Sequence, residues 1–103
     1  MQLIATLTGT GWLRTKDAGS AVATYRLDIY RETSGPEQGQ LITRGVLAAE
    51  AWALVVAKID RTAVLLLDTG EPVDVRLIDL GASDTTSNFV ISGKMPTFKS
   101  QRP

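Results

Sequence analysis

Alternating apolar and polar residues mark much of the chain, and residues 21–31 are the clearest example. From Ala21 to Ile29 every second residue is apolar, and most of the residues between them are polar. A period of two places the two sets on opposite faces of a β-strand, so we expect one buried and one exposed face. The residues expected to be buried are Ala21, Ala23, Tyr25, Leu27 and Ile29.

Other segments also have the composition of strands, separated by turn and loop residues. A first strand is expected over residues 2–8, continuing at 12–15 after Gly9 and Gly11, which would suit a bulge or bend. Pro36, between two glycines, indicates a loop before the third strand. The remaining strands are expected at residues 41–47, 62–67, 73–80 and 88–93.

Residues 48–59, AAEAWALVVAKI, fit both a helix and a strand. Five alanines and the length of the segment favour the helix. Apart from a narrow polar edge that includes Glu50, Lys58 and Arg61, this helix would be apolar, so it needs cover on more than one side. We expect burial in the domain or a homodimer interface. The candidate interface residues are Trp52, Val55 and Ile59.

These segments predict a mainly β protein, a small antiparallel barrel or sandwich of about six strands. One short helix is expected between the third and fourth strands. A length of 103 residues with 44% hydrophobic content suits one modest core, so we expect a single domain over residues 1–93. Residues 94–103 contain Lys94, Lys99 and Arg102 but no acidic residue, which predicts a basic, solvated C-terminal tail.

The composition excludes most catalytic chemistry. The chain has no cysteine and no histidine, so it lacks a thiolate nucleophile, a Ser-His pair and the ligands of a conventional zinc site. We therefore expect no enzyme activity, no cofactor and no metal. An enzyme that uses carboxylates alone with a bound cation is the remaining catalytic alternative, although no metal-loop spacing is present. Its candidate residues are Asp60, Asp74 and Asp79.

The stretch LLLDTG, which ends at Gly70, resembles the catalytic loop of aspartic proteases. That site needs two carboxylates that share a proton, together with a flap and a further glycine segment. Here Glu71 and Pro72 follow the glycine, and residues 71–103 are too few for the rest of such a subunit. Two strand patterns flank Asp68-Thr69-Gly70, which is typical of a hairpin turn. We interpret the stretch as a turn.

A second Asp-x-Gly turn, at Asp17-Ala18-Gly19, precedes a segment similar to the one after Gly70. VATYRLDI follows the first turn and VDVRLIDL follows the second. A duplicated hairpin in a pseudo-twofold barrel would produce this similarity. Ordinary hairpin composition would produce it as well, so both interpretations stay open.

The residues from Leu13 to Arg31 resemble the early strands of bacterial single-stranded-DNA-binding proteins. In that family a Gly-Thr-Ala-Val-Ala stretch leads into Phe-x-Leu and a basic residue, and here GSAVA leads into Tyr25-Arg26-Leu27. The order of strands and helix also resembles the family's OB barrel. The resemblance covers about a fifth of the chain and does not extend downstream. It implies that Tyr25 is a core aromatic and transfers no DNA-stacking residue.

Two functions follow from these patterns. The first is a non-catalytic module in protein-protein assembly, whose partner is a second copy of the chain or another protein. The alternative is single-stranded nucleic-acid binding, which requires aromatic residues and cations along an exposed groove. With 11 basic and 11 acidic residues, the chain has no net charge to attract phosphates. The candidate nucleic-acid-binding residues are Trp12, Arg14, Arg26, Tyr30 and Arg31.

The N-terminus lacks the basic and apolar regions of a signal peptide. The longest apolar run, residues 51–57, is far shorter than the roughly 20 residues that cross a membrane. We therefore expect a cytoplasmic protein with no membrane partner.

Overall fold

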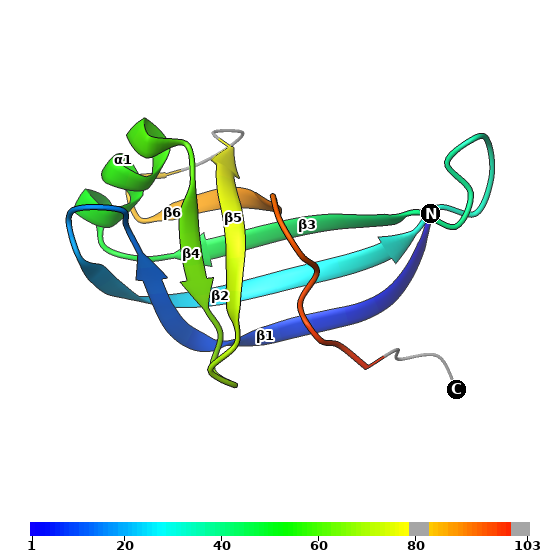
Figure 1. Cartoon of the computed structure of the whole chain (residues 1–103), viewed down its shortest axis with the longest axis horizontal. Coiled ribbons are helices and arrows are strands. Elements are labelled where there is room, and N and C mark those ends of the chain that lie inside the picture. The colour runs from blue at the N-terminus through cyan, green and yellow to red at the C-terminus, as the bar shows by residue number, and fades with distance from the viewer. Residues whose placement is uncertain (79–82, 100–103) are drawn as a thin grey trace.

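The computed structural model describes residues 1–78 and 83–99 and forms a closed six-stranded barrel with one helix in this part of the chain (Figure 1). The predicted fold class, mainly antiparallel β with a short helix between the third and fourth strands, is confirmed. The elements are β1 (Gln2–Arg14), β2 (Ser20–Arg31), β3 (Leu41–Ala48), α1 (Ala51–Asp60), β4 (Ala63–Leu66), β5 (Pro72–Ile78) and β6 (Thr86–Ile91).

The barrel closes in the order β1-β2-β3-β6-β5-β4, with every neighbouring pair antiparallel. It therefore consists of two three-stranded meanders, joined through the β1–β4 and β3–β6 pairs. Exchanging the first three strands with the last three leaves this order unchanged. Leu13 lies opposite Leu65 in the β1–β4 pair, and Gly45 lies opposite Phe89 in the β3–β6 pair.

The first meander is longer than the second and projects beyond the barrel. In β1 only Trp12–Arg14 pair with β4, and in β3 only Gly45–Ala48 pair with β6. The rest of β1, β2 and β3 continues as a three-stranded sheet toward the N-terminus, at the right of Figure 1. This projection makes the molecule elongated, with extents of 40 × 26 × 21 Å.

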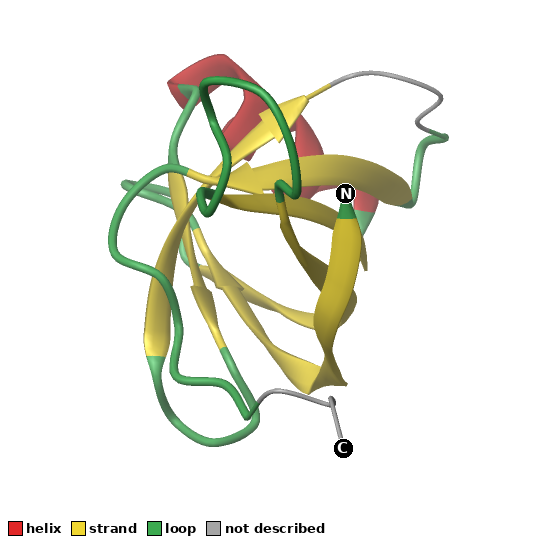
Figure 2. Cartoon of the chain, turned by 90° about the vertical axis from the view of Figure 1, so that its right-hand side faces the viewer, coloured by secondary structure: helices red, strands yellow, loops and turns green. Residues whose placement is uncertain are grey.

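The core lies inside the barrel, where the inward faces of the strands meet. The alternation predicted for β2 is confirmed, because all five residues expected to be buried are buried. Phe89, Leu47 and Leu65 fill the interior from the other strands. The helix α1 covers one end of the barrel with Ala53, Leu54 and Ala57. Figure 2, viewed from the opposite end, shows the strands wrapping around this interior with the helix behind them.

The expected interruption of the first strand at Gly9 and Gly11 is wrong. Both glycines remain in the β1–β2 ladder, and the irregularity in that ladder lies between Leu3 and Ala5. The glycines are needed because the space beside them is occupied. A Cβ on Gly9 would lie 2.7 Å from the Tyr25 hydroxyl, and a Cβ on Gly11 would overlap a backbone carbonyl of β4.

The stretch LLLDTG forms the end of β4 and the turn into β5, as predicted. The backbone N–H of Leu67 donates to the carbonyl of Glu71 at 2.9 Å, and the N–H of Gly70 donates back to Leu67 at 2.9 Å. Gly70 has φ 89°, a left-handed conformation that glycine adopts without the steric cost a Cβ would add. The residue types of this stretch therefore serve the geometry of a hairpin.

The β1–β2 and β4–β5 hairpin turns are closed by equivalent backbone hydrogen bonds, but they differ within the turn, because the positive-φ glycine is the last residue, Gly19, in the first turn and the penultimate residue, Gly70, in the second. Thr15 N–H donates to Gly19 in the β1–β2 turn as Leu67 N–H donates to Glu71 in the β4–β5 turn, both at 2.9 Å. The same shift in residue number superimposes the strand pairings of the two hairpins. This shift makes Gly19 the equivalent of Glu71, whereas the sequence similarity aligns Gly19 with Gly70. The symmetry of the strand pairing therefore follows a shift that differs by one residue from that of the Asp-x-Gly match.

The described part of the expected C-terminal tail, residues 94–99, packs back onto the barrel. Pro96 is buried, and Met95 and Phe98 pack against the core. The Glu71 carboxylate accepts hydrogen bonds from the backbone N–H of Thr97 at 3.0 and 3.1 Å and from its hydroxyl at 3.3 Å. Residues 94–99 thus differ from the expected solvated tail, because their apolar side chains pack against the barrel. Arg102 and the candidate carboxylate Asp79 lie outside the described residues.

Candidate functional site

The outward face of α1 carries three large apolar side chains that are exposed to solvent. Trp52, Val55 and Ile59 are 40%, 55% and 74% exposed. Their spacing of three and four residues places them on one side of the helix, opposite the buried residues Ala53 and Ala57. The three candidate interface residues therefore form one continuous surface, which we call the α1 face.

Small residues explain why α1 turns its larger apolar side chains outward. Alanines at 53 and 57 let the helix approach the end of the barrel closely, and Leu54 fills the space between them. The charged groups sit at the two ends and flanks of the helix. Glu50 precedes the first helical residue, and its Oε2 accepts a hydrogen bond of 2.9 Å from Trp52 Nε1. The indole N–H is therefore satisfied within the chain while the ring remains exposed.

A second apolar surface crosses four strands on the outside of the barrel. Trp12 in β1 lies opposite Val22 in β2 and Leu66 in β4, and Leu66 lies opposite Pro72 in β5. Trp12 is 48% exposed and Val22 is 51% exposed, whereas Leu66 is half-buried. Adjacent cross-strand positions place these side chains in one row.

The five candidate nucleic-acid-binding residues do not form one cluster. Trp12 and Arg14 share the outward face at the end of β1, and Arg26 and Tyr30 share the outward face of β2. Arg26 lies four residues from Val22, the partner of Trp12, which corresponds to roughly 13 Å along the strand. Arg31 falls on the opposite face of β2, because it is one residue from Tyr30.

A shallow groove of about 540 Å³ follows the outward face of β2, β3 and β6 beside Arg26. Arg44 extends from β3 into the same surface and lies over the Tyr30 ring, with its Cζ 5.8 Å from the ring centroid. The exposed Val46 of β3 and Asn88 of β6 also line the groove. Arg44, Val46 and Asn88 were not predicted, because their proximity to Arg26 depends on strand register.

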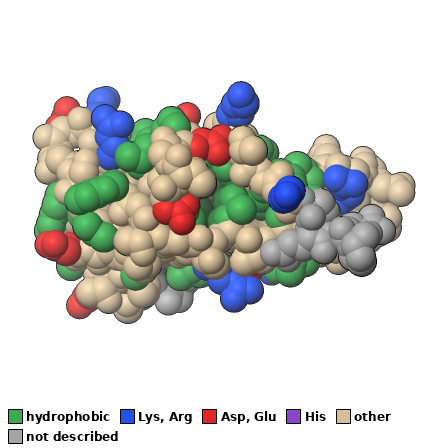
Figure 3. Space-filling view, turned by 90° about the horizontal axis from the view of Figure 1, so that it is seen from below, with side chains coloured by type: hydrophobic (Ala, Val, Ile, Leu, Met, Phe, Trp, Pro, Cys, Tyr) green, Lys and Arg blue, Asp and Glu red, His purple; other side chains and the backbone are tan. Residues whose placement is uncertain are grey.

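The charges of this groove are mixed. Arg26 Nε lies 3.3 Å from Asp28 Oδ1, and the same oxygen accepts a 2.8 Å hydrogen bond from the Thr6 hydroxyl. Asp28 therefore offsets one of the two arginines. Mixed charge is not confined to this groove. Figure 3, the view of the molecule from below, shows Lys, Arg, Asp and Glu side chains interspersed with hydrophobic ones, and no continuous basic area among the described residues on the face in view.

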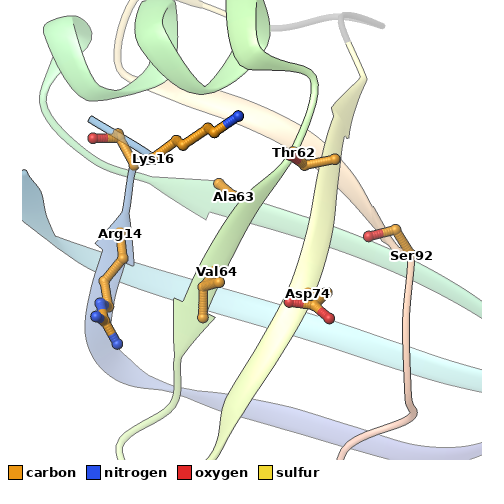
Figure 4. Close-up of a pocket in the computed structure, with 8 residues that line it drawn as sticks. Arg14, Lys16, Thr62, Ala63, Val64, Asp74 and Ser92 are labelled. Carbon is orange, nitrogen blue, oxygen red and sulfur yellow. The ribbon is translucent and has the colours of Figure 1, made fainter. Parts of the chain in front are cut away.

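A second hollow, of about 490 Å³, lies over the ends of β1 and β4. Arg14 and Lys16 both line it, yet Figure 4 shows the Lys16 side chain reaching toward Thr62 while Arg14 points away along β1. Asp74 of β5 and Ser92 lie next to each other on the other side of the hollow in the same view. Because the two cations diverge, the hollow lacks the convergent donors that would hold a small anion.

Asp68, the acidic residue of LLLDTG, is hydrogen-bonded to Tyr25. The Tyr25 hydroxyl donates to Asp68 Oδ1 at 3.1 Å and accepts from the backbone N–H of Asp68 at 3.2 Å. Burial raises the pKa of Tyr25 above its ordinary value of 10.0, opposed by the backbone hydrogen bond and reinforced by the Asp68 carboxylate. The phenol stays protonated at neutral pH. The nearby Glu71 carboxylate is engaged by Thr97, so these two acids stabilise the turn and the C-terminal segment.

Over residues 1–78 and 83–99, no group of three or more acidic residues is placed to hold a metal ion. No helix in this described portion has the length and apolar character to cross a membrane. No protein-family model, curated protein or solved structure matches the chain.

Proposed function

We propose that the protein is a non-catalytic β-barrel module that acts in protein assembly through its α1 face. A second copy of the chain is the expected partner, and another protein is the alternative. The supporting observation is the exposure of Trp52, Val55 and Ile59 together on one side of one helix. Large apolar side chains gathered on a surface are characteristic of interaction sites, whereas scattered ones need no explanation.

The energetics of burial favour this role. Covering an exposed Ile or Val side chain contributes about 1.5–3 kcal/mol, and tryptophan is among the residues that contribute most at interface centres. Trp52 already has its N–H satisfied by Glu50, so covering the ring would leave no unpaired donor. The residues of the α1 face do not support the core of their own barrel, since that side of the helix points away from it.

Ile59→Glu is expected to weaken self-association about 100-fold without unfolding the barrel. Each of two symmetry-related copies would lose a buried side chain, and a total loss of about 3 kcal/mol corresponds to about 100-fold weaker association. Sedimentation of the parent and the variant, from roughly 1 µM to roughly 1 mM, covers the affinity range of a small interface. Ile59 is the most exposed of the three residues, so the monomer should retain its stability.

Val22→Glu is the control, because Val22 is also an exposed apolar residue, 51% against 74% for Ile59, but lies on the β1–β2 surface. It should associate as the parent does. A parent that stays monomeric, or a folded Ile59→Glu variant that associates like the parent, would reject the α1 face as the assembly surface. Loss of association in Val22→Glu alone would indicate that the interface is the apolar surface around Trp12 and Val22.

Single-stranded nucleic-acid binding is a second candidate, supported by the groove on β2, β3 and β6. Arg26 and Arg44 line this groove, and Tyr30 lies beneath Arg44. A cationic groove with an adjacent aromatic ring has two of the features that hold single strands. The resemblance from Leu13 to Arg31 also favours this function. Asp28 and the zero net charge weigh against it, and an OB barrel has five strands where this barrel has six.

Titration with a labelled oligonucleotide at low and moderate salt tests this second candidate. If the groove binds phosphates, Arg44→Ala should weaken binding. The slope of log affinity against log salt concentration should also become shallower, by about the contribution of one phosphate contact. Arg31→Ala is the control, because Arg31 is exposed on the opposite face of the same strand. Absence of binding by the parent at low salt, or equal losses in both variants, would remove this function.

A further inference from the structure

We infer that residues 94–99, which we call the C-terminal strap, form a detachable cover over the inner face of the projecting β1–β2–β3 sheet, held closed by Glu71. The inference concerns the end of the molecule away from α1 and does not depend on the α1 face (Figure 1). It arises from the burial of the projection. Ile4, Ala5 and Ile29 are almost wholly buried, although they lie where β1 has no β4 neighbour and β3 has no β6 neighbour.

Among the described residues, the C-terminal strap supplies the missing cover. Met95 and Phe98 pack against the core cluster that contains Ile4 and Ile29. The other segment at this end, the loop of residues 33–40, is exposed throughout and adds no cover. In Figure 1 the chain after β6 crosses β3, β2 and β1 just beyond β5. Without the strap, the inner face of the projection would be an open apolar recess.

Few hydrogen bonds fix the C-terminal strap to the barrel. Pro96 has no N–H and favours an extended Met95, and residues 94–99 join no strand ladder. Just before the strap, the Ser92 N–H donates to the carbonyl of Asp74 at 2.9 Å, which fixes the point where the chain leaves β6. Beyond that point, residues 94–99 make no backbone–backbone hydrogen bond with other described residues. Segments with few such bonds open locally at low cost in free energy.

Glu71, in the turn between β4 and β5, supplies the main polar attachment of the strap. Its carboxylate oxygens accept both the backbone N–H and the hydroxyl of Thr97. Hydrogen bonds to a carboxylate are stronger than those between neutral groups. A hollow of about 380 Å³, lined by Leu7, Glu71 and Thr97, lies beside this contact, so the strap is not closely packed along its whole length. One carboxylate therefore controls whether the strap stays closed.

The recess beneath the strap already has an occupant, the strap itself. Met95 and Phe98 contribute apolar side chains, and Thr97 between them contributes the donors that Glu71 accepts. A segment tethered by a short linker occupies its site at an effective concentration in the millimolar range. The closed strap therefore excludes the same segment of a second copy, and the opened recess is expected to accept it. The strap is an autoinhibitory contact in this sense.

Trypsin cleavage of the Lys94–Met95 bond measures opening of the strap, because cleavage follows the population of the open form when reclosing is fast. Glu71→Ala should speed this cleavage about tenfold, since it removes the charge-assisted hydrogen bonds to Thr97. Glu37→Ala is the control, because Glu37 is an exposed acidic residue of the β2–β3 loop, and it should leave the rate unchanged. Cleavage after Arg61 reports unfolding elsewhere. Equal rates at Lys94 in Glu71→Ala and the parent, or a parallel rise after Arg61, would overturn the strap as a separate unit.

Charge exchange at the contact tests the role of Glu71. Thr97→Asp places a like charge beside the Glu71 carboxylate and should speed cleavage about tenfold. Thr97→Val keeps the backbone N–H and should have a smaller effect. The double variant Glu71→Lys with Thr97→Asp restores an opposite-charge pair and should return the rate toward that of the parent. A double variant cleaved as fast as Thr97→Asp would show that this contact does not hold the strap.

A labelled peptide with the sequence of residues 94–99 tests the recess. The full chain carrying Met95→Ser and Phe98→Ser should have an open strap with Glu71 intact, and it should bind this peptide at least tenfold more tightly than the parent does. The same peptide with Ser in place of Phe98 should not bind. Fluorescence anisotropy measures both affinities. Equal binding to the parent and the variant, or no binding at about 1 mM peptide, would overturn the recess as a site for this segment. Ile59→Glu should match the parent here, so failure of the α1 face would leave this inference standing.

Discussion

Gly11→Ala is expected to destabilise the barrel by about 3 kcal/mol or more, the upper part of the range for overpacking a well-filled core. A Cβ at this position would overlap the carbonyl oxygen of Leu66 and lie 3.0 Å from its carbonyl carbon. Both are backbone atoms of β4, so no rotation of a side chain can relieve the overlap. Gly11 lies beside the short stretch where β1 pairs with β4, and displacement there opens the barrel.

Urea unfolding followed by tryptophan fluorescence measures this loss. Thr10→Ala serves as the control, because Thr10 is the preceding residue of β1 and its side chain is exposed on the outside. It should change the free energy of unfolding by no more than about 0.5 kcal/mol, as surface substitutions do. Equal stability of the two variants would show that β4 does not approach β1 as closely as described.

Gly45→Ala is expected to cost about 2–3 kcal/mol, through a clash with a side chain. The ring of Phe89 lies directly against Gly45 across the β3–β6 pair, and a Cβ would overlap three of its ring atoms. Phe89 is fully buried, so the ring has little room to move. The glycine and the phenylalanine therefore occupy one shared space in the core.

A double-mutant cycle separates this clash from a general loss of backbone flexibility. In a Phe89→Leu background the ring is absent, and Gly45→Ala should then cost less than about 1 kcal/mol, a coupling typical of residues in contact. Thermal or urea unfolding of the four proteins provides the comparison. Additive effects of the two substitutions would mean that the glycine is required for a reason other than the ring.

The strands and their faces were predictable because they depend on local periodicity. The alternation in residues 21–31 identified the buried side of β2, and the helix at residues 51–60 followed from its alanines. The roles of Gly11 and Gly45 were not predictable, because each is set by a residue that is distant in the sequence, Leu66 and Phe89 respectively. A glycine in a strand pattern indicates a bend or a close approach, and only the pairing distinguishes them.

The candidate surfaces were predictable in part. The α1 face was identified from its apolar residues, but its outward direction depends on the barrel end, which accepts alanines and a leucine. For the nucleic-acid candidates, the period of two places Arg26 and Tyr30 together and excludes Arg31 from their face. Arg44 was missed because its position over Tyr30 requires the register between β2 and β3.

The arrangement of two meanders also sets the order in which the chain can reach its native state. Within each meander, neighbouring strands are close in sequence, so their turns can form early at little entropic cost. The β1–β4 and β3–β6 pairs join residues that are far apart, and both are needed to enclose the interior. We therefore expect closure to be the slowest stage of folding, and a chain arrested before it would present two open strand edges on each half.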